Sequence, residues 1–141
     1  MIRRLVHVGV AVKDATAAAE LFAALLGVRA GNIEEVTDQK VRTVHFDVGG
    51  GGIELLEPLS PDSPVAKFIA KRGEGVHHLS FEVDDIEAEI ARLRKEGFQM
   101  VDERLRHGAG GYTIAFLHPR STNGVLIEIG EKKGGESQGR E

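Results

Sequence analysis

The chain of 141 residues carries a net charge of −4 and contains no cysteine. This length fits one ordinary domain or two small fused half-domains, and a hydrophobic share of 41% can support a core. The acidic balance gives no argument for a nucleic-acid or membrane-surface partner. The absence of cysteine excludes disulfides, thiolate metal ligands and a cysteine nucleophile.

No apolar run approaches the roughly 18–20 residues that span a bilayer. The N-terminus also shows no signal-peptide pattern. Together with the missing cysteines, these features predict a cytoplasmic protein with neither a membrane nor a nucleic acid as partner. Residues 132–141 are glycine, charged and polar residues, so we expect a disordered tail.

The first half begins with a strand and a helix. Residues 3–12 alternate with a period of two, and the following helix is predicted to run from an N-cap at Asp14 to Gly27. Three further strands are predicted at 30–36, 40–48 and 52–57, with a glycine turn at 49–52 between the last two.

The second half repeats this order after a short connecting helix. Ser63 and Pro64 predict the N-cap and first position of that helix, which ends at Gly73. A strand at 78–83 then leads into a helix capped by Asp85. The remaining strands of this half are predicted at 99–103, 112–117 and 125–129.

Each half therefore follows the order β-α-β-β-β, and the predicted fold class is α+β. We expect a first module at 1–60, a connecting helix at 61–73, a second module at 74–131 and the tail at 132–141. A module of about 60 residues buries little surface alone, so two of them are expected to form one structure.

A histidine and a glutamate occur at matching points in both halves. His7 and His78 lie in the first strand of each half, and Glu54 and Glu128 lie in the last. Because the bulky apolar residues of each strand must face the helix, these four side chains fall on the opposite face. The same alternation selects His78 over His77. Three further polar residues are predicted on this face: Thr43, His45 and Ser80.

This set of side chains suits a divalent metal ion. Burying several titratable groups without a counter-charge is costly, whereas two neutral imidazoles and two carboxylates balance one divalent cation. Such nitrogen and oxygen ligands suit Co, Mn, Ni, Zn or Fe(II). A single histidine or glutamate is more often a surface or core residue, but four at equivalent points of a repeat favour a metal site.

Several sequence blocks resemble the methylmalonyl-CoA epimerases of the vicinal oxygen chelate superfamily, over residues 3–131. The most specific blocks are 53–58, 63–68, 73–78, 84–86, 108–111, 116–119 and 121–128. The resemblance implies two tandem βαβββ modules that form a curved, incompletely closed, eight-stranded mixed sheet. Because this fold serves many activities, the activity itself must be inferred from the site.

The resemblance also implies a function. The implied metal ligands are His7, Glu54, His78 and Glu128, with Co²⁺ as the first choice and Mn²⁺, Ni²⁺ or Zn²⁺ as alternatives. The implied reaction interconverts (R)- and (S)-methylmalonyl-CoA by abstraction of the α-proton through a metal-stabilised enolate. The implied partners are a small-molecule CoA thioester substrate and a second copy of the chain in a homodimer.

One position departs from the family pattern. In at least one member a glutamate has been proposed as general base at the position of Thr43, and threonine cannot accept a proton from carbon at neutral pH. The candidates for this role are Glu128, Glu54 and His45, of which we take Glu128 and His45 as catalytic. On the connecting helix, three basic residues are candidates to contact the CoA phosphates: Lys67, Lys71 and Arg72.

Three other functions are compatible with this fold. A lactoylglutathione lyase would use a similar four-ligand site on a glutathione hemithioacetal. A ring-cleaving dioxygenase would use two histidines and one glutamate, and the fourth ligand at Glu54 argues against it. A metal-free protein that sequesters small molecules would not need the His and Glu set.

Overall fold

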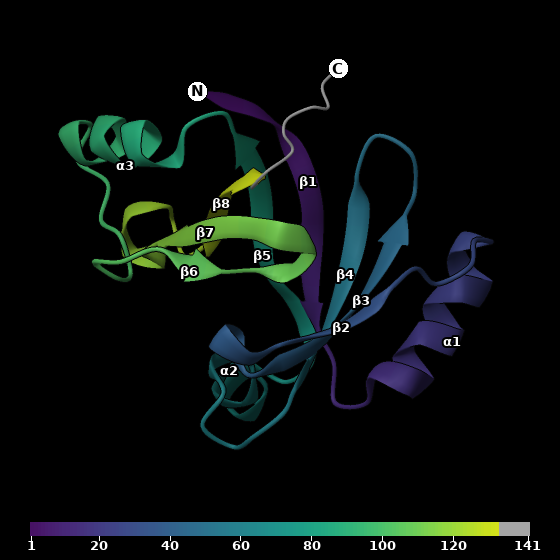
Figure 1. Cartoon of the computed structure of the whole chain (residues 1–141). Helices are drawn as coiled ribbons and strands as arrows, with labels where there is room; N and C mark the ends of the chain where they lie inside the picture. The colour runs from purple at the N-terminus through teal and green to yellow at the C-terminus, as the bar shows by residue number, and fades with distance from the viewer. Residues whose placement is uncertain (133–141) are drawn as a thin grey trace. The chain divides into compact units, whose positions relative to one another are not determined.

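The computed structural model describes residues 1–132 of the chain (Figure 1). The first module holds β1 (Ile2–Ala11), α1 (Ala15–Leu26), β2 (Ile33–Val36), β3 (Val41–Asp47) and β4 (Gly52–Pro58), and α2 (Pro64–Arg72) follows it. The second module holds β5 (Gly75–Val83), α3 (Ile86–Lys95), β6 (Arg106–His107), β7 (Tyr112–Leu117) and β8 (Ile127–Lys132). Short 3₁₀ turns lie at Thr37–Gln39, Ala109–Gly111 and Pro119–Ser121.

The eight strands form a mixed sheet in the order β2-β3-β4-β1-β5-β8-β7-β6. Within each module the first and last strands pair in parallel, β1 with β4 and β5 with β8, and the other pairs are antiparallel. The chain divides into two compact units, Val6–His77 and, in the other, Met1–Leu5 with the chain from His78 onward. The predicted pair of βαβββ modules and the eight-stranded mixed sheet are confirmed.

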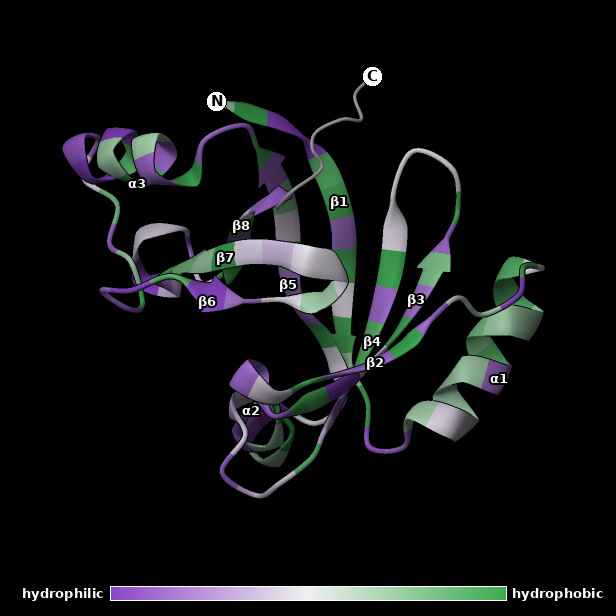
Figure 2. Ribbon diagram, in the orientation of Figure 1, coloured by the Kyte–Doolittle hydropathy of each residue, from purple (hydrophilic) through white to green (hydrophobic). Residues whose placement is uncertain are grey.

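The core of the first module lies between its strands and α1. Phe46 of β3 and Leu55 of β4 point to this side and have no exposed surface. Val12 and Val44 join them, and apolar residues of α1 pack against this cluster. Figure 2 shows α1 as a mainly hydrophobic helix, which fits its contact with β3 and β4. The opposite face of these strands is therefore left for polar side chains.

The second module has a core of the same design. Ile129 of β8 is fully buried and packs with Ala115 and Leu117 of β7 and with Leu93 of α3. Helix α3 alternates hydrophobic and hydrophilic residues along its length (Figure 2). Its apolar positions face the strands because a period of 3.6 places them along one side of the helix.

Both long helices are held at their N-termini by equivalent carboxylates. The Asp14 side chain accepts hydrogen bonds from the backbone N–H of Thr16 and Ala17, and Asp85 accepts from Ala88. A glutamate of the last strand adds a second contact. Glu57 accepts from the N–H of Ala15, and Glu131 accepts from that of Ile86, each at 3.0 Å. These caps satisfy N–H groups that have no partner within the helix.

The predicted caps of α1, α2 and α3 at Asp14, Ser63 and Asp85 are confirmed, but four strands differ from the prediction by two residues or more. β2 starts three residues later than the predicted 30–36, and β5 starts three residues earlier than the predicted 78–83. The strand predicted at 99–103 is wrong. Met100 forms only an isolated bridge to Leu117. The strand between α3 and β7 is instead the short β6, which lies further along the chain. The last strand starts two residues later than predicted and continues to Lys132. The rest of the predicted tail, 133–141, lies outside the described residues.

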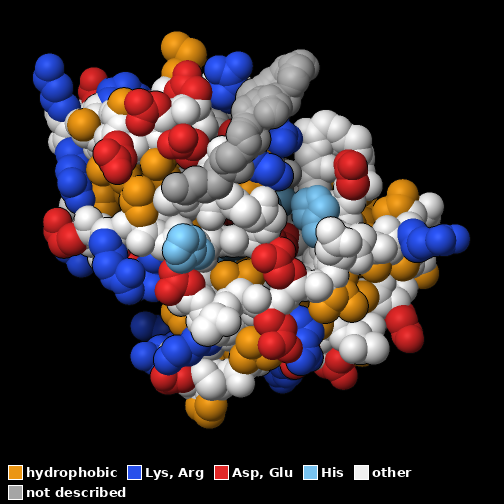
Figure 3. Space-filling view, in the orientation of Figure 1, with side chains coloured by type: hydrophobic (Ala, Val, Ile, Leu, Met, Phe, Trp, Pro, Cys, Tyr) orange, Lys and Arg blue, Asp and Glu red, His pale blue; other side chains and the backbone are white. Residues whose placement is uncertain are grey.

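Acidic and basic side chains are intermixed on the face shown in Figure 3, in keeping with a net charge of −4. Within the described part of the chain, no helix has both the length and the apolar character that would let it cross a membrane.

Candidate metal centre

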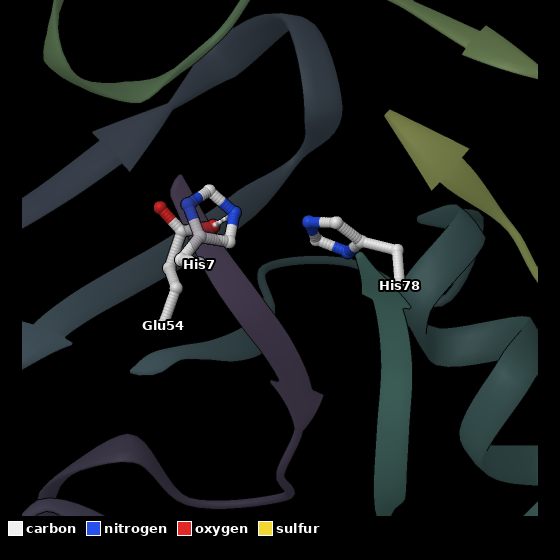
Figure 4. Close-up of side chains that lie close together, drawn as sticks. All are labelled: His7, Glu54 and His78. Atoms are coloured by element: carbon white, nitrogen blue, oxygen red, sulfur yellow. Dashed lines mark ion pairs between the residues drawn. The ribbon is translucent and has the colours of Figure 1, made fainter. Parts of the chain in front are cut away.

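The first module holds a buried histidine–glutamate pair on the face opposite α1. His7 comes from β1 and Glu54 from β4, and their side chains retain only 11% and 9% of their exposed surface. The His7 Nε2 atom lies 3.1 Å from Glu54 Oε1, as the dashed line in Figure 4 shows. Figure 4 also draws His78, which belongs to β5.

The second module holds an equivalent pair. The side chains of His78 of β5 and Glu128 of β8 are also buried, at 4% and 9% exposure, and the His78 Nε2 atom lies 3.4 Å from Glu128 Oε1. The prediction that His78 and not His77 faces this side agrees with the contacts. The ring of His77 instead packs edge-on against Phe68, with 4.9 Å between the centroids.

The two pairs arise from the same strand register. In the first module Glu54 lies opposite Gly9, two residues beyond His7 on the parallel partner strand. In the second module Glu128 lies opposite Ser80, again two residues beyond the histidine. Because side chains two residues apart share a face, each glutamate is brought beside its histidine. The duplicated module therefore produces one local geometry twice.

An aromatic ring lies edge-on to the histidine of each pair. In the first module this ring is His45 of β3, whose centroid lies 6.4 Å from that of His7. In the second module it is Phe116 of β7, at 6.0 Å from His78. A glycine makes room for His45, since a Cβ atom at Gly52 would lie 2.5 Å from the His45 Cε1 atom. The two rings occupy equivalent positions, because each is the cross-strand partner of a pair glutamate.

The remaining predicted residues have the following surroundings. Thr43 is buried, and its hydroxyl donates to the backbone carbonyl of Glu34 at 3.3 Å. The three basic residues of α2 are exposed, and the guanidinium of Arg72 lies 5.7 Å from the centroid of the Phe68 ring.

A polar cluster on the second module was not singled out from the sequence. The Tyr112 hydroxyl donates to Glu82 at 3.1 Å, and Arg4 pairs with the same carboxylate at 3.2 Å. Burial, together with the nearby negative charge of Glu82, raises the pKa of Tyr112 to about 12, so the phenol stays protonated. Glu82 shares its strand parity with His78, which is the one sequence signal that could have indicated this cluster.

The donor set fits a divalent cation. Each pair offers one imidazole nitrogen and one carboxylate oxygen, both buried. Burying these carboxylates without a cation would cost free energy. Nitrogen and oxygen donors without sulfur match the first-row divalent metals that the sequence predicted.

Comparison with known proteins places the chain in a family. Residues 6–116 match the family model described as the glyoxalase/bleomycin resistance protein/dioxygenase superfamily. The ethylmalonyl-CoA/methylmalonyl-CoA epimerase of Cereibacter sphaeroides is 38% identical, over 92% of this chain and 98% of that protein. The mitochondrial methylmalonyl-CoA epimerase of Homo sapiens is 37% identical, over 89% of this chain and 72% of that protein. The chain belongs to the methylmalonyl-CoA epimerase family.

Solved structures of this family have the same fold. The methylmalonyl-CoA epimerase of Mycobacterium tuberculosis superposes with a TM-score of 0.89 at 38% identity, over 93% of this chain and 89% of that chain. A methylmalonyl-CoA epimerase in complex with methylmalonyl-CoA and NH4+ superposes with a TM-score of 0.88 at 35% identity. That match covers 95% of this chain and 97% of the other. The predicted family and fold class are therefore confirmed.

Proposed function

We propose that this protein is an isomerase that interconverts (R)- and (S)-methylmalonyl-CoA. The observation that carries the proposal is the buried histidine–glutamate pair that recurs in the same register in both modules. The family supports the substrate, because its members are named for methylmalonyl-CoA and one is bound to it. The same comparisons favour the epimerase over lactoylglutathione lyase.

We further propose that His7 and Glu54 of the first module and His78 and Glu128 of the second bind one divalent ion. Co²⁺ is our first choice, with Mn²⁺, Ni²⁺ and Zn²⁺ as alternatives. When bound, such an ion acts as a Lewis acid that stabilises negative charge on the substrate oxygens. The buried pairs support the proposal because each places an imidazole nitrogen and a carboxylate oxygen, the donors that such an ion prefers, side by side.

The reaction needs groups that remove a proton from C2 of the substrate and return one to the opposite side. We propose Glu128 for this role on the second module, acting when its carboxylate is not bound to the ion. On the first module the candidate that we inferred from the sequence is His45, which lies beside His7. A positioned general base of this kind contributes about 10²–10⁴-fold to the rate.

Other parts of the proposal concern binding and assembly. Lys67, Lys71 and Arg72 are exposed on α2 and offer positive charge to the CoA phosphates. We also propose a homodimer that acts in the cytoplasm, and a boundary between the two modules at the connecting helix 61–73.

The proposal is tested by isotope exchange at the reacting carbon. Protein loaded with a divalent metal is incubated with methylmalonyl-CoA in D2O, and deuterium at C2 is followed by mass spectrometry. We expect exchange that depends on both protein and metal. Exchange no faster than the background would overturn the epimerase assignment, and turnover of methylglyoxal with glutathione in a parallel assay would favour the lyase.

A further inference from the structure

The face of the first module opposite α1 carries one more carboxylate, which the sequence did not single out. Glu34 lies on β2 directly opposite Thr43 of β3 in the antiparallel ladder. Its neighbour Ile33 lies opposite Val44, which is part of the core beneath α1. Since directly opposed residues share a face and neighbours alternate, Glu34 projects from the same face as Thr43 and Glu54.

The position of Glu34 on this face leaves room for a substrate. Two strand spacings, or about 10 Å, separate β2 from β4, which supplies the carboxylate of the buried pair. A proton acceptor must stand apart from the groups that bind the substrate oxygens, because the reacting carbon lies between them. Glu34 is an exposed residue of this face.

The neighbouring groups are less suited to this role. The Thr43 hydroxyl donates to the Glu34 carbonyl, and threonine is not a base at neutral pH. The His45 ring packs edge-on to His7 and lies close to Gly52. It therefore lies beside the histidine–glutamate pair and does not stand apart from it. Glu35 pairs with Arg42 at 2.9 Å, and both lie on the other face of the ladder.

The second module carries a residue of opposite charge at the position equivalent to Glu34. The residue that corresponds to Glu34 is Arg106, which lies opposite Ile114 in the equivalent β6–β7 ladder. Arg106 donates to Asp102 at 2.6 Å, and a guanidinium cannot accept a proton. The position thus carries a proton acceptor in the first module and a fixed cation in the second.

We propose that Glu34 is a catalytic general base of the epimerase, an assignment that rests on the proposed function. Its carboxylate takes the proton from C2 of the substrate, so that an O–H bond forms as the C–H bond breaks. The electron pair of that bond passes into the thioester group and gives an enolate. Glu128, the group proposed on the second module, starts protonated and gives its proton to the opposite side of C2, which completes the inversion, and Glu34 then releases the abstracted proton to solvent. Glu34 thereby replaces His45 in the role considered above.

The test compares Glu34→Gln with Glu35→Gln, which makes the same change one residue away on the opposite face. Deuterium entry at C2 is measured for each epimer separately with metal-loaded protein. We expect Glu34→Gln to slow exchange from one epimer by about 10²-fold or more, as loss of a general base predicts. The dissociation constant for 2-nitronate-propionyl-CoA, the ligand bound by the Streptomyces coelicolor epimerase, should stay unchanged. Glu35→Gln should match the parent protein.

A relocated carboxylate gives the decisive result. The double variant Glu34→Gln with Thr43→Glu moves the acceptor to the opposed residue on β3, and we expect it to regain at least about tenfold in exchange. Equal exchange in Glu34→Gln and Glu35→Gln, or a loss confined to His45→Phe, would overturn the assignment. An inactive parent protein would instead defeat the proposed function itself.

Discussion

The two modules differ around an otherwise identical pair of side chains. In both modules the first and last strands are parallel, and the residue opposite the glutamate lies two positions after the histidine. In both, an aromatic ring lies edge-on to the histidine. In the first module that ring is His45, and in the second it is Phe116. The next ladder positions carry Glu34 and Thr43 in the first module and Arg106 and Ile114 in the second.

This difference separates two requirements of the site. In the proposed function the repeated histidine and glutamate supply the metal donors, and each module contributes one of each. Proton transfer at one carbon requires acceptors at specific places, and the modules have different side chains there. The repeat thus accounts for two equivalent pairs of donors, and the residues that differ between the modules allow the two sides of the proposed reaction to differ.

The largest expected effect comes from removing either histidine of the pairs. If both modules contribute equally, His7→Ala and His78→Ala should each lower exchange by about 10²–10³-fold or more. Each should also lower the amount of metal that copurifies, measured by elemental analysis. His77→Ala is the matched control, because that ring packs on Phe68. A large loss in only one of the two variants would break the equivalence of the pairs.

The cores provide a second comparison. Leu55 in the first module and Ile129 in the second are fully buried at equivalent places, one residue beyond the pair glutamate. Leu55→Ala and Ile129→Ala should each lower the free energy of unfolding by about 2–5 kcal/mol. Chemical denaturation followed by circular dichroism measures this change. A loss below that of an exposed control such as Leu25→Ala would contradict the packing described here.

His45→Phe gives the first module the ring that the second module carries. The edge-on contact with His7 is kept, so we expect metal content close to that of the parent and a loss of exchange of no more than about tenfold. Exchange and metal content are measured on the same preparation. A loss of exchange as large as that of Glu34→Gln would indicate that His45 is the proton acceptor.

The smallest expected effect concerns acid stability and is specific to the second module. Glu89 of α3 is buried, and Arg92 together with the N-terminal ammonium group holds the pKa of this carboxyl below its usual value of 4.5. The equivalent residue of α1 is Ala18. A lowered pKa means that the ionised carboxylate stabilises the fold above pH 4.5, and that this contribution is lost as the pH falls through the folded-state value.

The variant Glu89→Gln should therefore lower the free energy of unfolding by about 1–3 kcal/mol at neutral pH. The difference from the parent should shrink as the pH falls from 4.5 through the lowered pKa of Glu89 in the folded protein, because the parent carboxyl then loses its charge. Thermal unfolding between pH 3 and pH 7 measures it. A difference that does not change across this range would show that the charge of Glu89 plays no part.

Much of the fold could be predicted because the relevant signals are local. The caps at Asp14, Ser63 and Asp85 follow from residue types over a few positions, and the structure confirms them. The faces of His78 and Glu128 follow from a period of two within single strands. The sequence by itself therefore determined the repeated module and the side of each strand on which its histidine or glutamate lies.

Only the tertiary structure decided which residues oppose one another across the ladders. β2 and β6 are short, and β6 lies beyond the predicted strand at 99–103, so neither Glu34 nor Arg106 could be assigned to a face from its own neighbours. Register depends on hydrogen bonds and packing between segments far apart in the chain, which leave no periodic trace in either segment. The choice between His45 and Glu34 rests on that long-range pairing.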